Sequence, residues 1–366
     1  MNAEIDELIR TPFAVAPLSR EVVVYGAGNC GRAVSAYLGK TGHRVVAFLD
    51  AAAVSGQRLD GIPVHRPAEW PGRWPAGELD VVVAVHNYAV DMVLLIAQVR
   101  GLGFRRVLNM VDFHNHFPDG QPYRFWLTAR IFYRGREREI EAAMALLGDA
   151  TSRRWFSDVL AFRLSGDYSR LPAPCTADQY FPASLPRWSN PIRFIDCGAF
   201  DGDTVEALAR AGYGFDAIAA FEPDPANFVA LAARVRRHGA ASCFPCGVAD
   251  STRIVRFASG AGMGSHETPD GNAVIQCVAI DEALPGFRPT LLKMDVEGAE
   301  RDALEGARRT IADARPSLAI ALYHRPQDLW EIPQQIAGWN LGYRLEIRGH
   351  GHGSFDTVLY ALPGGG

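Results

Sequence analysis

Short hydrophobic runs alternate with segments of helical periodicity along the chain, and several of the runs end at a turn that contains glycine. Near the start, the β-branched run Glu21–Tyr25 is followed by glycines, an apolar-periodic segment at Arg32–Leu38 and a second run at Arg44–Leu49. Further on, the apolar run that begins at Phe194 also ends in a glycine turn, and Val205–Arg210 has the pattern of a helix. Repeats of strand, helix and strand indicate an α/β fold with parallel sheets.

The pattern changes between these two regions. Asp112–Tyr123 is polar and interrupted by Pro and Gly, which predicts a linker. Phe125–Leu147 and Thr151–Leu164 predict two helices, the second capped by Thr151 or Ser152, whose aromatic side chains are expected to cover one face of the sheet that follows. We therefore predict three parts: a smaller Rossmann-like domain at 1–118, a linker and helical cover at 119–190, and a doubly wound α/β domain at 191–366.

The C-terminal part continues the alternation. Predicted strands are Ala217–Phe221, Ser242–Phe244, Ile254–Ala258, Ala273–Ala279, Leu291–Val296 and Leu318–Tyr323, followed by a closing antiparallel pair at Tyr343–Ile347 and Thr357–Leu362. Predicted helices are Ala299–Ala312 and Asp328–Trp339. Ser259–Asn272, rich in Gly, Ser and Asp, is predicted to be a mobile loop near the site.

The glycine turn after Phe194 is the first candidate binding site, because a strand that ends there presents free backbone N–H groups at the carboxyl edge of the sheet. The carboxylates of Asp201 and Asp203 would repel a pyrophosphate, but they suit a ligand with hydroxyls and positive charge, such as S-adenosylmethionine. Glu222, at the end of the next strand, is placed to accept hydrogen bonds from both ribose hydroxyls. The candidate cofactor residues in these two stretches are Asp196, Gly198, Ala199, Phe200, Asp201, Gly202, Thr204, Glu222, Pro223, Asp224 and Asn227.

Four motifs in order, FIDCGAFDGDT, AFEPDPANF, LLKMDVEGAERDALEGA and ALYHRPQDLWEIP, resemble the FkbM family of S-adenosylmethionine-dependent methyltransferases. The resemblance extends from about Pro191 to Pro363 and implies a class I methyltransferase sheet. It also implies that Gly247 and Val248 contact the adenine, and that Tyr180, in a segment similar to one that precedes the first strand in the family, lies over the cofactor.

Candidates for catalysis follow two later strands of this domain, at the edge where such sheets bind their ligands. They are Asp295 and Glu297 after one strand and His324 after the next. We expect His324 to act as general base on an acceptor hydroxyl, since its ordinary pKa is near neutral pH, although a His that caps the next helix is the alternative. Mg²⁺ held by the carboxylates is a second, less favoured route, and no residue is assigned as a metal ligand.

Other polar residues near the strand ends have a structural interpretation, and some also have a ligand-binding one. Strand alternation puts Lys293 and Asp295 on one side, so Lys293 is expected to pair with Asp295. Positively charged or titratable residues later in the chain are expected to be either solvated loop residues or ligands of an acceptor phosphate. These are Arg325, Arg348, His350 and His352.

The N-terminal glycines form a second motif. Gly26, Gly28 and Gly31 have the G-x-G-x-x-G spacing between a strand and a helix, and Asp50 ends the next strand 19 residues beyond Gly31. The segment from here to about Val85 resembles the N-terminal domain of sugar O-acyltransferases and the leading segment of nucleotide-sugar dehydratase-type proteins. Two readings stay open: a site for NAD, a nucleotide or a nucleotide sugar, and a scaffold or oligomerisation module.

Composition and charge limit the cellular location and the kinds of binding partner that we expect. The net charge of −4, the 48% hydrophobic and 21% charged content, and the acidic N-terminus predict a cytoplasmic protein without a signal peptide, membrane span or nucleic-acid partner. The six scattered cysteines read as reduced thiols, with a zinc site at Cys243 and Cys246 the less favoured alternative, and His114 with His116 as a solvated loop pair.

Together these features predict an S-adenosylmethionine-dependent O-methyltransferase acting on a hydroxyl of a carbohydrate, nucleotide sugar or related natural product, as a monomer or a homo-oligomer. The acceptor class comes from the FkbM resemblance. The competing prediction is an NAD- or nucleotide-sugar-dependent sugar-modifying enzyme, or a scaffold, in which the N-terminal domain is the principal binding module. A short-chain dehydrogenase is excluded, since neither Lys40 nor Lys293 stands four residues after a tyrosine.

Overall fold

The computed structural model describes residues 3–14, 16–70, 76–119, 125–176, 178–260, 266–268 and 270–364. The chain forms two compact units that alternate along the sequence. Unit 1 contains residues 1–141, 154–174 and 351–355, and unit 2 contains residues 142–153, 175–350 and 356–366. The segment 119–190, which the sequence predicts to be a separate cover, is thus divided between the two units.

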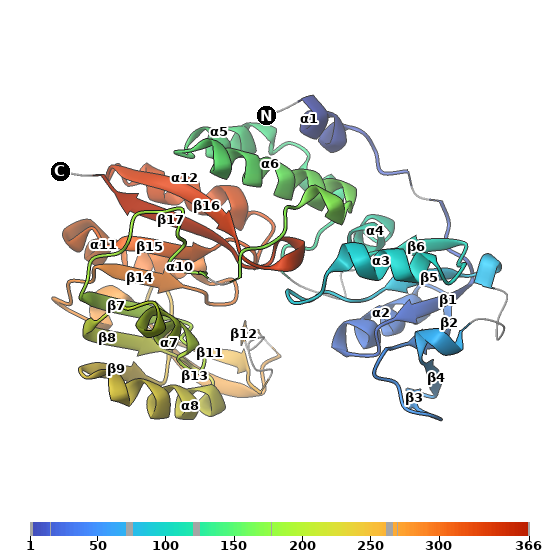
Figure 1. Ribbon diagram of the computed structural model, residues 1–366, viewed down its shortest axis with the longest axis horizontal. Helices are drawn as coiled ribbons and strands as arrows, with labels where there is room; N and C mark the ends of the chain where they lie inside the picture. The colour runs from blue at the N-terminus through green and yellow to red at the C-terminus, as the bar shows by residue number, and fades with distance from the viewer. Residues whose placement is uncertain are drawn as a thin grey trace. The chain divides into compact units, whose positions relative to one another are not determined.

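Unit 1 is built on a six-stranded sheet of order β3-β4-β2-β1-β5-β6, parallel except for the β3–β4 pair (Figure 1). Its strands are β1 (Glu21–Tyr25), β2 (Arg44–Leu49), β3 (Arg58–Leu59), β4 (Ile62–His65), β5 (Asp80–Val83) and β6 (Arg106–Leu108). The two predicted strands that flank the glycine fingerprint are confirmed with the same bounds. Their runs of β-branched and apolar residues are buried, as expected for central parallel strands.

Of the four α-helices of unit 1 given next, the sequence predicted only α2. They are α1 (Ala3–Arg10), α2 (Asn29–Lys40), α3 (Met92–Arg100) and α4 (Met110–His116), with the 3-10 turns η1 (Pro67–Glu69), η2 (Ala76–Glu78), η3 (Arg130–Tyr133), η4 (Tyr168–Arg170) and η7 (His352–Ser354). Helix α4 lies where a linker was predicted, because Asn109 and Asp112 form a reciprocal capping box. His114 is buried on this helix with Nδ1 2.8 Å from the carbonyl oxygen of Met110, so the predicted solvated histidine pair is wrong.

The predicted helix at Phe125–Leu147 is not continuous. It is replaced by η3 and, after Gly135 with its positive φ of 79°, by α5 (Glu137–Ala145). The next helix, α6 (Ala150–Ser165), is confirmed, but Asp149 supplies the cap by accepting the Ser152 N–H at 2.6 Å. The aromatic residues of this region are buried as core, and they belong to unit 1 rather than to the unit of the C-terminal sheet. The fully buried ones are Trp126, Tyr133, Phe156 and Phe162.

Unit 2 contains a seven-stranded sheet of order β16-β17-β15-β14-β7-β8-β9 (Figure 1). Its strands are β7 (Ile192–Cys197), β8 (Phe215–Phe221), β9 (Ala241–Phe244), β14 (Leu291–Met294), β15 (Ser317–Ala321), β16 (Tyr343–Gly349) and β17 (Thr357–Pro363). The first five are parallel, whereas β17 runs antiparallel to both β15 and β16, which confirms the predicted closing pair. The carboxyl ends of β7, β8, β14 and β15 therefore meet at one edge.

A second sheet of four strands, of order β10-β13-β11-β12, separates elements that the sequence assigned to the main sheet. Its strands are β10 (Gly247–Val248), β11 (Arg253–Ala258), β12 (His266–Glu267) and β13 (Ala273–Val278). Strand β12 lies inside the predicted loop Ser259–Asn272, of which residues 261–265 and 269 lie outside the described part.

The helices of unit 2 flank the strand ends. They are α7 (Asp203–Arg210), α8 (Pro225–Val235), α9 (Ile280–Ala283), α10 (Glu300–Gly306), α11 (Arg308–Ala314) and α12 (Asp328–Gly338), with η5 (Arg236–His238). Helices α10 and α11 replace one predicted helix, which breaks at Ala307. Within the described ranges, every helix is too short or too polar to cross a membrane.

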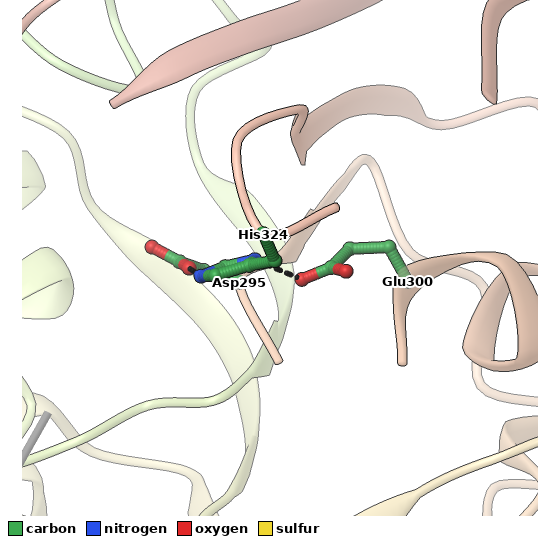
Figure 2. Close-up of side chains that lie close together, drawn as sticks. All are labelled: Asp295, Glu300 and His324. Atoms are coloured by element: carbon green, nitrogen blue, oxygen red, sulfur yellow. Dashed lines mark hydrogen bonds and ion pairs between the residues drawn. The ribbon is translucent and has the colours of Figure 1, made fainter. Parts of the chain in front are cut away.

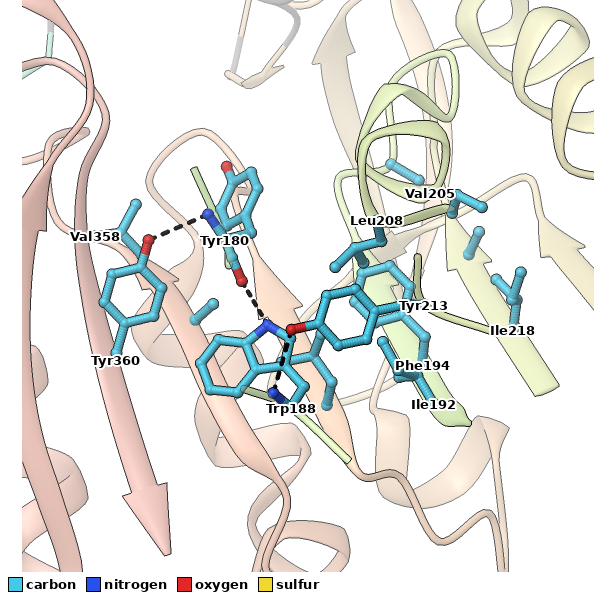
Figure 3. Packing of buried hydrophobic residues seen from close by; sticks show 14 of the residues in the cluster. Tyr180, Trp188, Ile192, Phe194, Val205, Leu208, Tyr213, Ile218, Val358 and Tyr360 are labelled. Carbon is cyan, nitrogen blue, oxygen red and sulfur yellow. Dashed lines mark hydrogen bonds between the residues drawn. The ribbon is translucent and has the colours of Figure 1, made fainter. Parts of the chain in front are cut away.

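The core of unit 2 holds one loop residue in place by polar as well as apolar contacts. Trp188, Tyr213 and Tyr360 pack among the apolar side chains of the sheet (Figure 3). Trp188 Nε1 donates to the carbonyl oxygen of Tyr180 at 2.7 Å, and the N–H of Tyr180 donates to Tyr360 Oη at 3.1 Å. Tyr180 itself has a φ of 71°, a conformation that such surroundings must stabilise. The core thereby fixes the backbone of Tyr180 next to the site.

Candidate active site

The turn between β7 and α7 requires glycine at its first position. Gly198 has a φ of 73°, and a Cβ atom there would lie 1.9 Å from the carbonyl oxygen of Asp295. The N–H groups of Gly198 and Ala199 both donate to the carbonyl oxygen of Phe221. The backbone after β7 therefore touches the backbone after β14, which leaves no room for any side chain at residue 198.

Glu222 follows β8 and holds the same turn from the other side. Its Oε2 accepts the N–H of Phe200 at 2.9 Å, and its Oε1 accepts the N–H of Asp224 at 2.9 Å. Burial raises the pKa of Glu222, and these backbone bonds oppose the increase. With two backbone N–H bonds and a 3.4 Å contact from Asn227 Nδ2, the carboxylate still has acceptor capacity for a ligand hydroxyl.

Lys293 does not pair primarily with Asp295, as predicted from strand alternation. Because residue 293 of β14 lies opposite residue 196 of β7, its Nζ is 3.0 Å from Asp196 Oδ1 and 2.6 Å from the carbonyl oxygen of Gly198. Burial raises the pKa of Asp196 to about 6, and the ammonium of Lys293 limits this increase. Both side chains are buried, and Lys293 stabilises the glycine turn through its bond to Gly198.

Several other predicted cofactor residues have structural partners. Asp201 forms an ion pair with Arg234 at 2.6 Å. Asp224 caps α8 and accepts bonds from Ser259 Oγ and the N–H of Gly260. Gly202 is the N-cap of α7 in a left-handed conformation, and Thr204 lies buried in the first turn of that helix. Gly247 and Val248 form β10 in the second sheet, and Pro223 lies between Glu222 and Asp224 at the strand end.

The three predicted catalytic residues do come together. His324 follows β15, and its Nε2 lies 3.3 Å from Asp295 Oδ1 and 3.8 Å from Glu297 Oε1. The other ring nitrogen, Nδ1, is 2.7 Å from Glu300 Oε1 at the start of α10. Figure 2 shows the ring between the carboxyl groups of Asp295 and Glu300. Glu297 has a φ of 57°, which is strained for a residue with a side chain and indicates a functional constraint.

This arrangement changes the expected behaviour of His324. Burial favours the neutral ring, but the charges of Glu300, Glu297 and Asp295 outweigh it and raise the pKa of His324 to about 10. An imidazole that is protonated at neutral pH cannot accept a proton, so the expectation of a base with a nearly unperturbed pKa is wrong for this geometry. Burial alone would raise the pKa of Asp295, but the positive charges of His324 and Lys293 keep it below the usual value.

Two tyrosines complete the site. Tyr180 Oη donates to Asp295 Oδ2 at 2.7 Å, and Tyr323 Oη donates to Asp295 Oδ1 at 3.1 Å. Tyr180 thus contacts a catalytic candidate as well as standing near the cofactor turn. Sequence analysis missed the roles of Tyr323 and Glu300; Tyr323 stands beside His324 at a strand end, which was the available signal.

Arg348 and His350 were predicted to be either solvated loop residues or ligands of an acceptor phosphate, and the solvated reading is wrong because both have partners within the protein. Arg348 forms ion pairs with Asp149 at 2.7 Å and Glu346 at 2.8 Å. His350 is buried, with Nδ1 2.6 Å from the carbonyl oxygen of Cys175 and Nε2 2.8 Å from Tyr360 Oη. Both residues hold the strands of the sheet edge together.

The N-terminal fingerprint in unit 1 has the same construction as the turn at Gly198. Asp50 Oδ2 accepts the N–H of Ala27 at 2.8 Å, and its Oδ1 accepts the N–H of Ala52 at 2.9 Å. Gly31 must be glycine, because a Cβ there would lie 1.9 Å from the carbonyl oxygen of Gly26. Around Gly28, by contrast, no atom of the described residues lies within 4 Å of an added Cβ. The space at Gly28 is therefore open for a ligand.

Comparison with known families gives one match. Residues 196–345 match the family model described as the Methyltransferase FkbM domain. This range contains the glycine turn, Glu222 and the cluster around His324. No curated protein sequence matches the chain.

Comparison with solved structures shows how far the fold is shared. The crystal structure of methyltransferase FkbM from Methylobacillus flagellatus KT gives a TM-score of 0.79 at 23% identity, over 99% of this chain and 94% of that chain. An rRNA methylase from Streptococcus thermophilus gives 0.32 at 13% identity, over 48% of this chain and 88% of that one. Aeropyrum pernix fibrillarin, solved with natively bound S-adenosyl-L-methionine, gives 0.29 at 14% identity, over 48% and 67%. The first match shows a common fold over nearly the whole chain.

Proposed function

Because residues 196–345 match the family model of the Methyltransferase FkbM domain, we propose that this protein is an S-adenosylmethionine-dependent O-methyltransferase. Its acceptor is a hydroxyl of a carbohydrate, a nucleotide sugar or a related natural product. The observation that carries the proposal is the contact between Gly198 and Asp295, since it joins the cofactor turn to the polar cluster around His324 at one sheet edge.

The residues of the turn fit S-adenosylmethionine. Glu222 has acceptor capacity for ribose hydroxyls, and the carboxylates of Asp196 and Asp295 give the edge a negative field that favours a sulfonium. Gly247 and Val248, at the end of the segment after β9, are assigned to the adenine side by family resemblance.

When bound, S-adenosylmethionine supplies an electrophilic methyl group, which passes to the acceptor oxygen while the sulfur keeps the electron pair of the broken bond. Asp295 and Glu297 are assigned to bind the acceptor hydroxyl and receive its proton, with Tyr180 and Tyr323 fixing Asp295 through its two oxygens. His324 positions both carboxylates. Their shared task is to hold the acceptor oxygen in line with the methyl group and to exclude water.

Glu222→Ala is expected to weaken S-adenosylmethionine binding by about 2–3 kcal/mol, or roughly 30- to 150-fold in Kd, because two ribose hydroxyls lose a charged acceptor. Isothermal titration calorimetry on the full chain measures this. Glu305→Ala is the matched control, since Glu305 is an exposed glutamate of the same unit. Equal affinities in the wild type and Glu222→Ala, with folding intact, would remove Glu222 from the cofactor site.

A second binding function is favoured by the bonds of Asp50 in unit 1. Asp50 stabilises the glycine turn through Ala27 as Glu222 does through Phe200. We assign to Gly26, Gly28, Gly31 and Asp50 a site for NAD, a nucleotide or a nucleotide sugar. A nucleotide sugar is preferred, since it would serve as the acceptor or as its carrier.

Gly28→Val tests this second site, because Gly28 has an ordinary φ of −80° and open space around its added Cβ. The variant should fold normally yet lose the thermal stabilisation that the wild type gains from one member of a panel of NAD, NADP, UDP-sugars and GDP-sugars. If millimolar concentrations of every compound leave the wild-type melting temperature unchanged, unit 1 is a scaffold.

A further inference from the structure

The side chains around His324 are arranged as ligands around a single point. His324 Nε2 faces Asp295 Oδ1 at 3.3 Å and Glu297 Oε1 at 3.8 Å, and one ligand atom each from Asp295, Glu300 and His324 lies within 4.8 Å of the others. A first-row divalent cation bonds nitrogen and oxygen at about 2.0–2.2 Å, so two of its ligand atoms lie roughly 3.0–3.6 Å apart. The separation between His324 and Asp295 matches that spacing, and Glu297 is a few tenths of an ångström from it.

Glu300 sets the direction of the histidine ring. Its Oε1 bonds His324 Nδ1 at 2.7 Å and also accepts the N–H of Val296 at 2.9 Å. With Nδ1 engaged by this carboxylate, Nε2 is the ring atom turned to Asp295 (Figure 2). The same nitrogen lies 3.8 Å from Glu297 Oε1. A carboxylate that binds the far nitrogen of a ligating histidine is the usual outer-shell arrangement of metal sites in proteins.

Asp295 is oriented in a similar way. Its two oxygens accept bonds from Tyr180 at 2.7 Å and from Tyr323 at 3.1 Å, so the carboxyl group cannot rotate away from His324. The ligand candidates therefore have their own supporting donors and acceptors before any ion arrives.

Buried charge in the cluster gives an independent reason for a cation. Glu300 is 1% exposed, and its Oε2 has no hydrogen-bond partner among the described residues. Three carboxylates, those of Asp295, Glu297 and Glu300, surround one imidazole, while the nearest ammonium, on Lys293, is bound to Asp196 and Gly198. A buried carboxylate is stable only when it is paired, hydrogen-bonded or bound to a metal, and the single imidazole of His324 faces three acidic groups, of which Glu300 is buried and Asp295 and Glu297 are partly buried.

We propose that His324, Asp295 and Glu297 bind one divalent first-row transition cation, which displaces the proton from His324 Nε2 into solvent, with Glu300 as the outer partner that keeps its bond to Nδ1. A mixed set of one imidazole and two carboxylates suits Mn²⁺, Zn²⁺ or Fe²⁺, whereas Mg²⁺ favours oxygen ligands alone. The proposal rests on the proposed function for its use: an acceptor hydroxyl on the open coordination positions would have a lowered pKa and an oriented lone pair. Binding of the ion can be tested separately from methyl transfer.

The test uses the full-length protein, stripped with a chelator, with Mn²⁺ alone as the probe. Calorimetry and the EPR signal of free Mn²⁺ should show one ion bound per chain, in the absence of S-adenosylmethionine. His324→Gln and Glu297→Gln should each weaken binding by about 10- to 100-fold or more, and Glu305→Gln, an exposed change of equal charge, should leave it unaltered. Co²⁺ absorption provides a second readout, since its ligand-field bands should shift when the nitrogen ligand is lost in His324→Gln.

Failure of this proposal is distinguishable from failure of the methyltransferase proposal. If Mn²⁺, Zn²⁺ and Fe²⁺ each fail to bind the stripped wild type at millimolar concentration, or bind His324→Gln and Glu297→Gln as tightly as the wild type, the metal site is excluded. S-adenosylmethionine binding, measured separately on the same stripped protein, decides the other question. Should His324→Gln not fold, Glu297→Gln still decides, because the Glu297 side chain is partly exposed at 17%.

Discussion

His324→Ala is expected to lower the rate of methyl transfer by about 10²–10⁴-fold while leaving the affinity for S-adenosylmethionine almost unchanged. His324 contacts three carboxylates at 2.7–3.8 Å, and these belong to Asp295, Glu297 and Glu300, not to the glycine turn at Gly198. Its loss leaves Asp295, Glu297 and Glu300 without the group between them. The carboxylates assigned to bind the acceptor hydroxyl are then no longer held in position. Single-turnover kinetics at saturating acceptor, with calorimetry for the cofactor, measure both quantities.

His238→Ala serves as the control, because the His238 ring bonds Glu206 on α7 and is not part of the cluster. A residual rate within a few-fold of wild type, at saturating acceptor and across pH, would contradict a catalytic role for His324. Glu300→Gln should give a smaller loss, since the amide oxygen can still accept the bond from Nδ1 while the charge is removed. The order of the three rates therefore shows whether the charge of Glu300 or the ring of His324 matters more for positioning Asp295 and Glu297.

The grouping of the candidate residues at one edge of the sheet was predictable from sequence because it depends on local rules. The carboxyl ends of parallel strands meet at one edge of a sheet. This edge therefore brings together the glycine turn after the first strand, the acid at the end of the next strand, and the polar residues after β14 and β15. The predicted closing strands were found because Tyr343–Gly349 alternates apolar and polar residues and Thr357–Pro363 is a continuous apolar run. These features follow from chain order and pattern alone.

The partners within the site were not predictable, since they depend on register between strands. Lys293 pairs with Asp196 because residues 293 and 196 lie opposite each other on β14 and β7, whereas alternation along β14 alone suggested Asp295. Glu300 reaches His324 across 24 residues, and no spacing rule connects them. Sequence also cannot report that three carboxylates surround one imidazole, an arrangement that raises the pKa of His324.

Two errors had a different origin. The capping box at Asn109 and Asp112 was readable in the sequence, but the polar composition and nearby Pro and Gly were taken as a linker signal. Arg348 and His350 were interpreted from charge alone, and their partners come from segments far away in the chain, Asp149 and Cys175. Local composition predicts a solvated loop or charged face correctly only when its polar side chains have no partners from distant parts of the chain.

Lys293→Met is expected to lower the free energy of unfolding of unit 2 by about 3–5 kcal/mol, because it leaves the buried carboxylate of Asp196 without its ammonium. The variant should also bind S-adenosylmethionine more weakly, since Lys293 Nζ holds the carbonyl oxygen of Gly198. Hydrogen exchange of the β7 and β14 amides measures the local stability. Lys40→Met is a matched control, because Lys40 is the other lysine of the chain and is exposed, so a change within about 0.5 kcal/mol is expected there.

The stability lost in Lys293→Met should depend on pH, and the pKa of Asp196 gives the direction of that dependence. The pKa of Asp196 is already raised to about 6 by burial with Lys293 present, and removing the ammonium raises it further. A carboxyl whose folded-state pKa exceeds its unfolded value, about 3.9, loses stability as pH rises through that interval. The deficit of Lys293→Met should therefore be largest near pH 8 and shrink towards pH 5, and Asp196→Asn combined with Lys293→Met should recover much of it. A deficit that is equal at both pH values, with double-variant losses that simply add, would mean that the pair contributes through packing and not through charge.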